Sequence, residues 1–385
     1  MSWRFLLLLG WSLAWAEDAR VESLRAMLVP MRDVRPAEGD KGRGAGPQFT
    51  AIKHELRDWV EGRLKGVEVE GNEQDLIRDL NKDLRDAGLL CGWGPTDTRC
   101  PDWFHLGYLS KLELRQKGRL LAHITGVGIE CGFDESVYLF GHSSEGWRRV
   151  WQSEQNDYTE GQYKPQTIRS VQLSPYNRAN DYLITSVGIV PWCSSTWHDV
   201  YYRVFRPGLD LEAKPLVDGA VFANVNSPPE GAITAQDALV EYTITRSDGN
   251  FRRAVRHYEI SGDRAVLTDP LALSPRAFVE EWMDLAWKEA GGRWTEDARR
   301  KQLRDWHENG GKDARYAFPT MHCAAAPDLW QVQFEYDPPK KPVYFLVRWR
   351  PPYRFTMVGV SDRADARCRE EDRDADDDRT LFPGR

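Results

Sequence analysis

The sequence predicts a mainly β protein: an array of about three four-stranded antiparallel units, preceded by an α-helical N-terminal segment and followed by an α+β part. After Gly107 the spacing of apolar residues changes from the helical three or four to the period of two that is typical of strands. The segment ITGVGI at 124–129 recurs as ITSVGI at 184–189, with five of six positions identical. The dipeptide Ile244-Thr245 follows at the same spacing. Such repeats favour a propeller-like or meander array, with a large β-sandwich as the alternative.

Residues 1–16 have the pattern of a secretory signal peptide. Arg4 precedes an apolar run of leucines, and Ala14 and Ala16 supply the small residues of a cleavage site before Glu17. The run is shorter than the roughly 20 residues that a membrane-spanning helix needs. We therefore expect a secreted or periplasmic protein whose mature chain does not insert into a membrane.

Residues 17–106 form the predicted helical N-terminal segment. In residues 72–90, Leu76, Leu80 and Leu84 recur every four residues, which predicts an amphipathic helix with Asn72 as its N-cap. The stretch 35–48, rich in glycine and charge, predicts a loop between this helix and an earlier one. A cysteine loop at 91–100 ends the segment.

Residues 107–272 form the predicted repeat-built β domain, with turn residues between its strands at the spacing of antiparallel structure. The predicted strands up to Phe205 are 108–114, 120–129, 136–140, 147–152, 168–173, 182–190 and 200–205. Between two of them, the segment 141–146 superficially resembles a nucleophile elbow, but a strand follows it, so it predicts a hairpin turn.

Residues 273–368 form the predicted α+β C-terminal domain. Ser274 followed by Pro275 predicts an N-cap and the first turn of a helix, and a second short helix is expected at 295–306. Three strands, at 330–336, 343–349 and 354–360, complete this domain. Residues 369–385 carry clustered carboxylates, which repel one another in a compact structure and predict a disordered acidic tail.

Six cysteines in an exported chain predict three disulfides. Locality along the chain favours Cys91–Cys100 and Cys323–Cys368, which leaves Cys131–Cys193. The last pair follows equivalent strands of adjacent repeat units and is expected to join one sheet to the next. The cysteine spacing does not fit a zinc motif, so we expect neither a metal nor a cofactor.

The charge balance disfavours nucleic acid as a partner. The formal net charge is −7, and removal of Arg4 with the signal peptide makes it −8. Nucleic-acid binding depends on lysine and arginine contacts with phosphates. The partners that remain are a small molecule, a glycan or another protein.

The loop 191–199 is the richest candidate for ligand binding. Trp192 and Trp197 supply indole rings for stacking, and His198 and Asp199 supply polar anchors, which together suit a sugar or a peptide. The alternative is structural, with the tryptophans covering the end of a sheet and the polar residues forming its turn.

A second candidate is the carboxylate pair Asp134 and Glu135, which the segment CGFDES places in a turn. Two carboxyl groups whose environments separate their pKa values can act as general acid and base. Acidic residues in turns also have a plain hydrogen-bonding role.

A third candidate is an anion site. Arg348 and Arg350 alternate along a strand and share a face, with Arg354 nearby, and together they could hold a carboxylate or a phosphate. A solvated face, or docking of the acidic tail on these arginines, are the alternatives.

Two functions follow from these patterns. The first is a secreted, disulfide-stabilised binding or scaffold protein without catalytic activity, since no complete set of nucleophile, base and acid is found. The alternative is an extracytoplasmic hydrolase of glycans or peptides that uses Asp134, Glu135, His198 and Asp199. Convergence of these four side chains in one pocket would favour the hydrolase.

Overall fold

A computed structural model describes most of the chain and divides it into two compact units. Unit 1 comprises residues 1–222 with 233–235, and unit 2 comprises 223–232 with 236–385. The described residues are 19–34, 43–65, 67–69, 73–90, 106–160, 162–176, 181–191, 193, 197–208, 211, 214–224, 230–233, 237–245, 251–309, 316–335 and 341–371. The predicted signal peptide, Cys91–Cys100 pair and tail beyond residue 371 lie outside them. Within the described part, no helix is long and apolar enough to cross a membrane.

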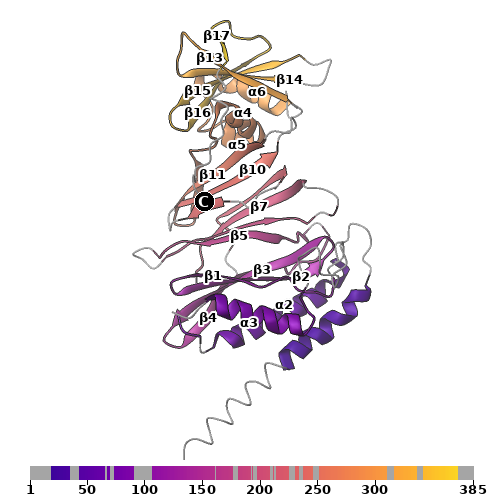
Figure 1. Cartoon of the computed structure of the whole chain (residues 1–385). Coiled ribbons are helices and arrows are strands. Elements are labelled where there is room, and N and C mark those ends of the chain that lie inside the picture. Colours follow the sequence, from indigo (N-terminus) through magenta and orange to yellow (C-terminus); the bar gives the residue numbers. More distant parts are fainter. Residues whose placement is uncertain are drawn as a thin grey trace, which may run out of the picture. The chain divides into compact units, whose positions relative to one another are not determined.

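Unit 1 begins with helices, as predicted. They are a helix over residues 19–28, the short 3₁₀ helices η1 (Val29–Asp33) and η2 (Arg43–Ala45), α2 (Gly46–Leu64) and α3 (Glu73–Asp86). However, α2 starts within the predicted loop 35–48. The predicted N-cap Asn72 lies outside the described residues. The apolar stripe of α2 contains Phe49, Ile52, Leu56 and Trp59, all buried. These side chains belong to an apolar cluster shared with the first sheet. Figure 1 shows α2 lying against one face of that sheet.

Sheet 1 consists of β1 (Glu113–Lys117), β2 (Leu120–Ile129), β3 (Gly132–Ser143) and β4 (Gly146–Ser153), in sequential antiparallel order. The turn between β3 and β4 is the predicted hairpin, with Gly146 at φ 92°. Every residue of β2 is buried, because sheet 1 has the helices on one face and sheet 2 on the other. A strand that is covered on both faces loses the alternation of polar and apolar residues.

Sheet 2 consists of β5 (Thr167–Leu173), β6 (Ile184–Ile189), β7 (Trp197–Phe205) and β8 (Val217–Asn224), again in sequential order. It packs on sheet 1 through a shared apolar cluster. Trp151 of β4 and Phe205 of β7 meet there with ring centroids 4.6 Å apart.

The sequence repeat is also a structural repeat. The segments 124–129, 184–189 and 244–245 lie in β2, β6 and β10, and each is the second strand of a four-stranded sheet. The prediction of consecutive four-stranded units is therefore confirmed. The one mismatch, Gly126 against Ser186, has a local cause: a Cβ at Gly126 would approach Cγ of Glu135 to 2.7 Å.

The predicted disulfide between the repeat units is present. Cys131 lies in the turn after β2 and bonds to Cys193, which follows β6. The bond joins the equivalent ends of two repeat units, as expected, and so fixes sheet 1 to sheet 2.

Unit 2 contains sheet 3, formed by β9 (Glu230–Ile233), β10 (Asp237–Thr245), β11 (Phe251–Ser261) and β12 (Arg264–Thr268). The helices α4 (Pro275–Asp284), α5 (Trp287–Ala290), η3 (Asp297–Arg299) and α6 (Arg300–Asn309) follow. The Ser274 hydroxyl accepts a hydrogen bond from the Ala277 amide, so the predicted N-cap is confirmed.

Sheet 4 completes unit 2, and α4 and α6 pack on one of its faces. Its strands are β13 (Tyr316–Cys323), β14 (Leu329–Glu335), β15 (Val343–Arg350), β16 (Arg354–Ser361) and β17 (Cys368–Glu371). The three strands expected here are β14 to β16, and the prediction missed the other two. β13 contains Pro319 and an irregular register, and β17 is short and acidic, so neither has a clear strand pattern. The Cys323–Cys368 disulfide links these two strands, as predicted.

Candidate functional site

The sequence predicts Asp134 and Glu135 in a turn, but both residues lie in strand β3. Neighbouring residues of a strand project to opposite faces of the sheet. Asp134 contacts Lys53 of α2 on the helix-covered face, whereas Glu135 bonds to Ile168 of β5 in sheet 2. The two carboxylates therefore do not form an acid and base pair.

Asp134 belongs to a buried ion pair. Lys53 Nζ donates to Asp134 Oδ2 at 2.6 Å, and both side chains are 1% exposed. The same ammonium donates to the Gln155 carbonyl and the Tyr158 hydroxyl, each at 3.1 Å, and that hydroxyl donates to Asp134. Burial raises the pKa of Asp134, and the charge of Lys53 opposes the increase. Lys53 thus fixes α2 to sheet 1, and Asp134 has a structural role.

Glu135 connects the two sheets of unit 1. Its Oε2 accepts a hydrogen bond of 2.6 Å from the Ile168 amide, and its own amide donates to the Gln166 carbonyl at 2.9 Å. Burial raises the pKa of the Glu135 carboxyl to about 7, despite the opposing effect of the Ile168 hydrogen bond. This carboxyl group is thus protonated in the folded state at pH values where the unfolded chain has lost the proton.

Glu135→Gln is expected to stabilise the protein at alkaline pH and to have little effect near pH 4. Between pH 4.5 and about 7 the folded state binds a proton that the unfolded state has released, so the wild type loses stability as the pH rises through this window. Glutamine keeps the acceptor for the Ile168 amide without a charge. We expect a gain of about 3 kcal/mol at pH 8, since the pKa shift from 4.5 to about 7 corresponds to roughly 1.4 kcal/mol per pKa unit. Urea denaturation as a function of pH would measure it. Parallel pH profiles of the two proteins would contradict this assignment.

The matched control is Glu145→Gln, in the exposed β3–β4 turn. Glu145 pairs with Arg148 on the surface, where both side chains are exposed. Surface ion pairs contribute little, so its pH profile is expected to follow that of the wild type within about 0.5 kcal/mol.

The predicted aromatic loop is described in part. Trp192 lies outside the described residues, and only the backbone of Trp197 is described, as the first residue of β7. His198 Nδ1 lies 3.0 Å from the Val190 carbonyl oxygen, and Asp199 is exposed. Among the contacts of described residues, none links His198 or Asp199 to Asp134 or Glu135. Convergence of the four side chains is thus not observed.

The arginine site is largely neutralised. Arg348 bonds to Glu296 at 2.6 Å and to Asp328 at 3.0 Å, and its hydrogen bond with Glu296 raises its pKa. Arg350 and Arg354 face each other across the β15–β16 pair and are exposed. Arg348 therefore cross-links its neighbours, and only the other two predicted anion ligands remain exposed to solvent.

A hollow that the sequence did not reveal lies between β4 of sheet 1 and β7 and β8 of sheet 2. We call it the β4–β7 hollow, with a volume of about 300 Å³, at the lower end of the range of ligand pockets. Its lining residues are Gln152, Ser153, Glu154, Arg203, Phe205, Lys214, Pro215 and Asp218. Because these residues are separated along the chain, only the stacking of the two sheets brings them together.

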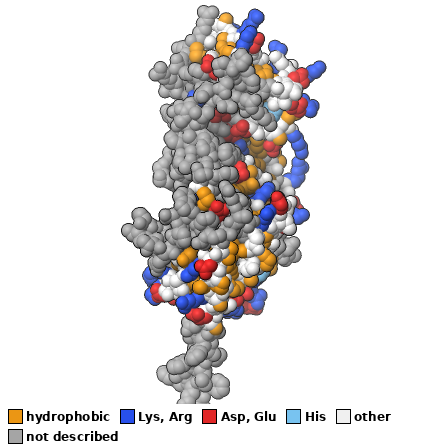
Figure 2. All heavy atoms as spheres, turned by 90° about the vertical axis from the view of Figure 1, so that its right-hand side faces the viewer, with side chains coloured by type: hydrophobic (Ala, Val, Ile, Leu, Met, Phe, Trp, Pro, Cys, Tyr) orange, Lys and Arg blue, Asp and Glu red, His pale blue; other side chains and the backbone are white. Residues whose placement is uncertain are grey.

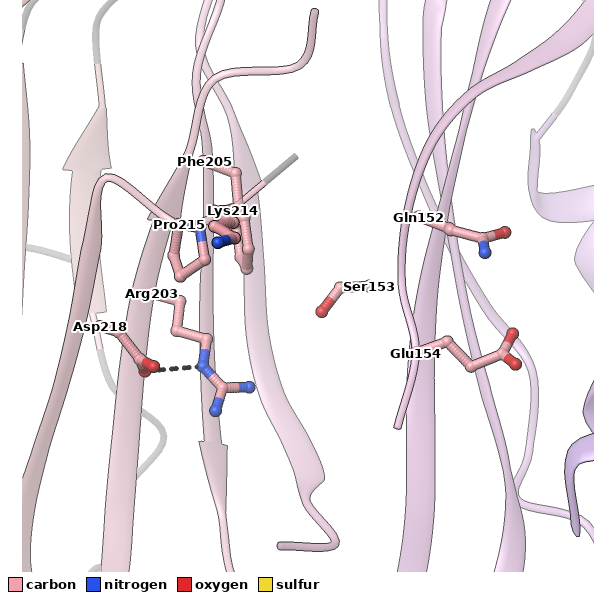
Figure 3. A pocket seen from close by; sticks show the side chains of 8 residues that line it. All are labelled: Gln152, Ser153, Glu154, Arg203, Phe205, Lys214, Pro215 and Asp218. Atoms are coloured by element: carbon pink, nitrogen blue, oxygen red, sulfur yellow. Dashed lines mark hydrogen bonds and ion pairs between the residues drawn. The ribbon is translucent and has the colours of Figure 1, made fainter. Parts of the chain in front are cut away.

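Alternation along β4 determines which side chains enter this hollow. Figure 3 shows Ser153 pointing toward sheet 2, while Gln152 and Glu154 point away from it. Glu154 instead accepts a hydrogen bond from the Tyr138 hydroxyl at 2.5 Å and lies 3.0 Å from His54. Its negative charge is thus engaged on the opposite face of sheet 1.

The opposite wall carries cations above an apolar floor. Arg203 donates through Nε to Asp218 at 2.8 Å and through Nη1 to Gln166 at 3.3 Å (Figure 3 shows the first bond). Lys214 is exposed beside Pro215, and Phe205 is nearly buried against Trp151. The hollow therefore offers a fixed guanidinium, an ammonium, a hydroxyl and a carboxylate to a polar ligand.

The described surface has no broad region of one charge on the face in Figure 2, where acidic and basic side chains intermingle. Glu130 lies close to the sulfurs of Cys131 and Cys193, with ligand atoms within 4.8 Å of one another. Those sulfurs are bonded to each other, and thiolates rather than disulfides are the usual metal ligands. The geometry there does not suit a metal.

Comparisons with known proteins place the chain in no family. No protein-family model matches the chain, and no curated protein matches it. Several solved structures show a distant likeness. They include the α-L-arabinofuranosidase Arb93A of Fusarium graminearum (11% identity, 68% of each chain covered, TM-score 0.27). They also include a mutant α-L-arabinanase of Cellvibrio cellulosa (8% identity, 65% of this chain and 77% of that chain covered, TM-score 0.24).

A third similar structure is an endo-1,4-β-xylanase of Bacteroides thetaiotaomicron, with 8% identity, 67% of this chain and 78% of that chain covered, and a TM-score of 0.23. Scores this low do not establish a common fold, so the site must be judged from its own geometry.

Proposed function

We propose that this chain is a secreted, non-enzymatic glycan-binding protein and that a saccharide unit occupies the β4–β7 hollow. The observation that carries the proposal is the pairing of apolar surface at Pro215, beside the buried Phe205, with the polar groups of Ser153, Arg203 and Lys214. A saccharide presents apolar C–H faces together with hydroxyl groups, which this combination matches.

Binding is favoured over hydrolysis by the position of the carboxylates. A glycosidase needs two carboxyl groups on either side of one bond, at roughly 5–10 Å from each other. Asp134 and Glu135 project to opposite faces of sheet 1, and Glu154 is turned away from the hollow. Asp218 is the carboxylate that remains on its wall, where it bonds to Arg203.

Export to an oxidising compartment is part of the proposal. Cys131–Cys193 and Cys323–Cys368 are both formed, and stable disulfides are typical of secreted and periplasmic proteins. The predicted signal peptide at 1–16 supports the same location. The consecutive four-stranded units would then act as a rigid scaffold for the hollow. We also propose that these units belong to a propeller-like array.

Arg203→Ala is expected to weaken glycan binding at least tenfold, because a charge-assisted hydrogen bond contributes about 1.5–3 kcal/mol. Isothermal titration calorimetry with saccharides selected on a glycan array would measure the change. Arg148→Ala is the matched control, since this exposed arginine of β4 pairs with Glu145 away from the hollow. Equal losses in both variants, or a wild type that binds none of the arrayed glycans at millimolar concentration, would contradict the proposal.

A further inference from the structure

We infer that the β4–β7 hollow selects a saccharide with a single carboxylate, a uronate, over the corresponding neutral sugar. This inference rests on the proposed glycan-binding function and specifies its ligand. It depends on the charge balance of the hollow, on the fixed position of Arg203 and on the arrangement of the remaining polar groups.

The charge balance leaves one positive charge. Arg203 and Lys214 face the hollow as cations, and Asp218 faces it as a carboxylate. The carboxylate of Glu154 is fully buried, and its partners Tyr138 and His54 lie on the other face of sheet 1. One anionic group on the ligand would neutralise this excess, whereas a neutral sugar would leave it uncompensated.

The guanidinium of Arg203 is held in a defined orientation. Asp218 accepts its Nε–H, Gln166 accepts from Nη1, and the ring of Tyr201 lies beside it with a centroid distance of 5.6 Å. With the Gln166 amide turned so that its oxygen faces the guanidinium, that oxygen accepts from both terminal nitrogens at 3.2 Å. Three of the five N–H donors of Arg203 are then used. The two that remain can donate to the oxygens of a ligand carboxylate. Because the group is already oriented, little side-chain entropy is lost on binding.

The remaining groups match the hydroxyls of a uronate ring. The carboxylate of Asp218 can accept from a hydroxyl, and the Ser153 hydroxyl can donate or accept. Ser153 points into the hollow from the opposite wall, so a ring between the sheets could meet both (Figure 3). Lys214 is exposed at the rim, where its ammonium adds long-range attraction for an anion.

The test compares three ligands: one with a carboxylate, its neutral methyl ester, and one with a sulfate in place of the carboxylate. A trisaccharide with one galacturonate residue, its methyl ester and a galactose trisaccharide with one sulfate group are titrated into the disulfide-bonded protein at about 50 mM salt. We expect the free acid to bind at least tenfold more tightly than the ester and the sulfated sugar. Arg203→Gln should reduce the preference for the acid over the ester to about twofold, and Asp218→Asn should increase affinity for the acid.

Lys82→Gln makes the same change of charge as Lys214→Gln, but on the exposed face of α3, where Lys82 pairs with Asp86. Of these two lysine variants, only Lys214→Gln should lower affinity for the acid, by about threefold. Equal binding of acid and ester would overturn the uronate inference while glycan binding stands. Equal or tighter binding of the sulfated sugar would overturn the choice of carboxylate. Failure of the acid, ester, sulfated and arrayed glycans alike would overturn the proposed function itself.

Discussion

Lys53→Met is expected to destabilise unit 1 by about 3–5 kcal/mol at pH 7.5, because it leaves the Asp134 carboxylate buried without its counter-charge. Asp134 Oδ1 has no hydrogen-bond partner among the described groups, so Lys53 and Tyr158 carry its stabilisation. Urea denaturation followed by circular dichroism would measure the loss as a lower midpoint with an unchanged slope.

The loss of stability in Lys53→Met is expected to depend on pH. Without Lys53, desolvation raises the pKa of Asp134 still further, and the folded protein retains a proton that the unfolded chain releases above its usual pKa near 4. The cost of Lys53→Met is therefore largest at neutral pH and shrinks as the pH falls toward 4. A loss that is independent of pH would indicate a packing effect instead.

Two further variants keep this prediction testable even if the single variant does not fold. The double variant Lys53→Met, Asp134→Leu removes both charges, and apolar replacement of a buried pair is often neutral, so most of the stability should return. Lys82→Met breaks the exposed Lys82–Asp86 pair and should cost no more than about 0.5 kcal/mol. A Lys53→Met variant as stable as Lys82→Met would contradict the role of the buried pair.

The architecture of unit 1 was predictable where its sequence repeats. The match between 124–129 and 184–189 identifies the second strand of two sheets, because the same register and the same burial on both faces select the same residues. The pairing of Cys131 with Cys193 follows from this alignment. The signals for β13 and β17 were weak, since Pro319 interrupts the first and charge dominates the second.

The placement of Asp134 and Glu135 was wrong for a physical reason. Acidic residues next to glycine suggest a turn, but a strand can contain a carboxylate when a cation from another element pairs with it. Lys53 lies within the apolar stripe of α2, between Phe49 and Leu56, where a solvated lysine would not be expected. That position was the one signal for a buried ion pair.

The β4–β7 hollow could not be predicted from local patterns. Its groups come from strands that are distant in the sequence, and their proximity depends on how sheet 1 stacks on sheet 2. Alternation does place Arg203 on the same face of β7 as Phe205, which contacts Trp151. The sequence signal for the hollow was thus a charged residue, Arg203, on the same strand face as a buried aromatic residue, Phe205. This signal could be interpreted only after the packing of sheet 1 on sheet 2 was known.

Removal of the Cys131–Cys193 disulfide by a double alanine substitution is expected to cost unit 1 about 4 kcal/mol. The cysteines are 62 residues apart, and the model of loop-closure entropy assigns roughly this value to a loop of that length. The apolar cluster with Trp151 and Phe205 remains to hold the sheets together, so we expect a folded but weakened protein. Urea denaturation under non-reducing conditions would measure the difference.

Hydrogen exchange would locate this loss. Sheet 1 keeps its cover of helices on one face, whereas sheet 2 loses its covalent link, so amides of β5 to β7 should lose protection before those of β2 and β3. Cys323→Ala with Cys368→Ala is the matched control, because that bond spans 45 residues and joins β13 to β17 in unit 2. It should cost a similar free energy but leave exchange in β5 to β7 unchanged. Uniform deprotection of all strands of unit 1 in the first variant would show that the disulfide stabilises the unit as a whole and not the joint between its sheets.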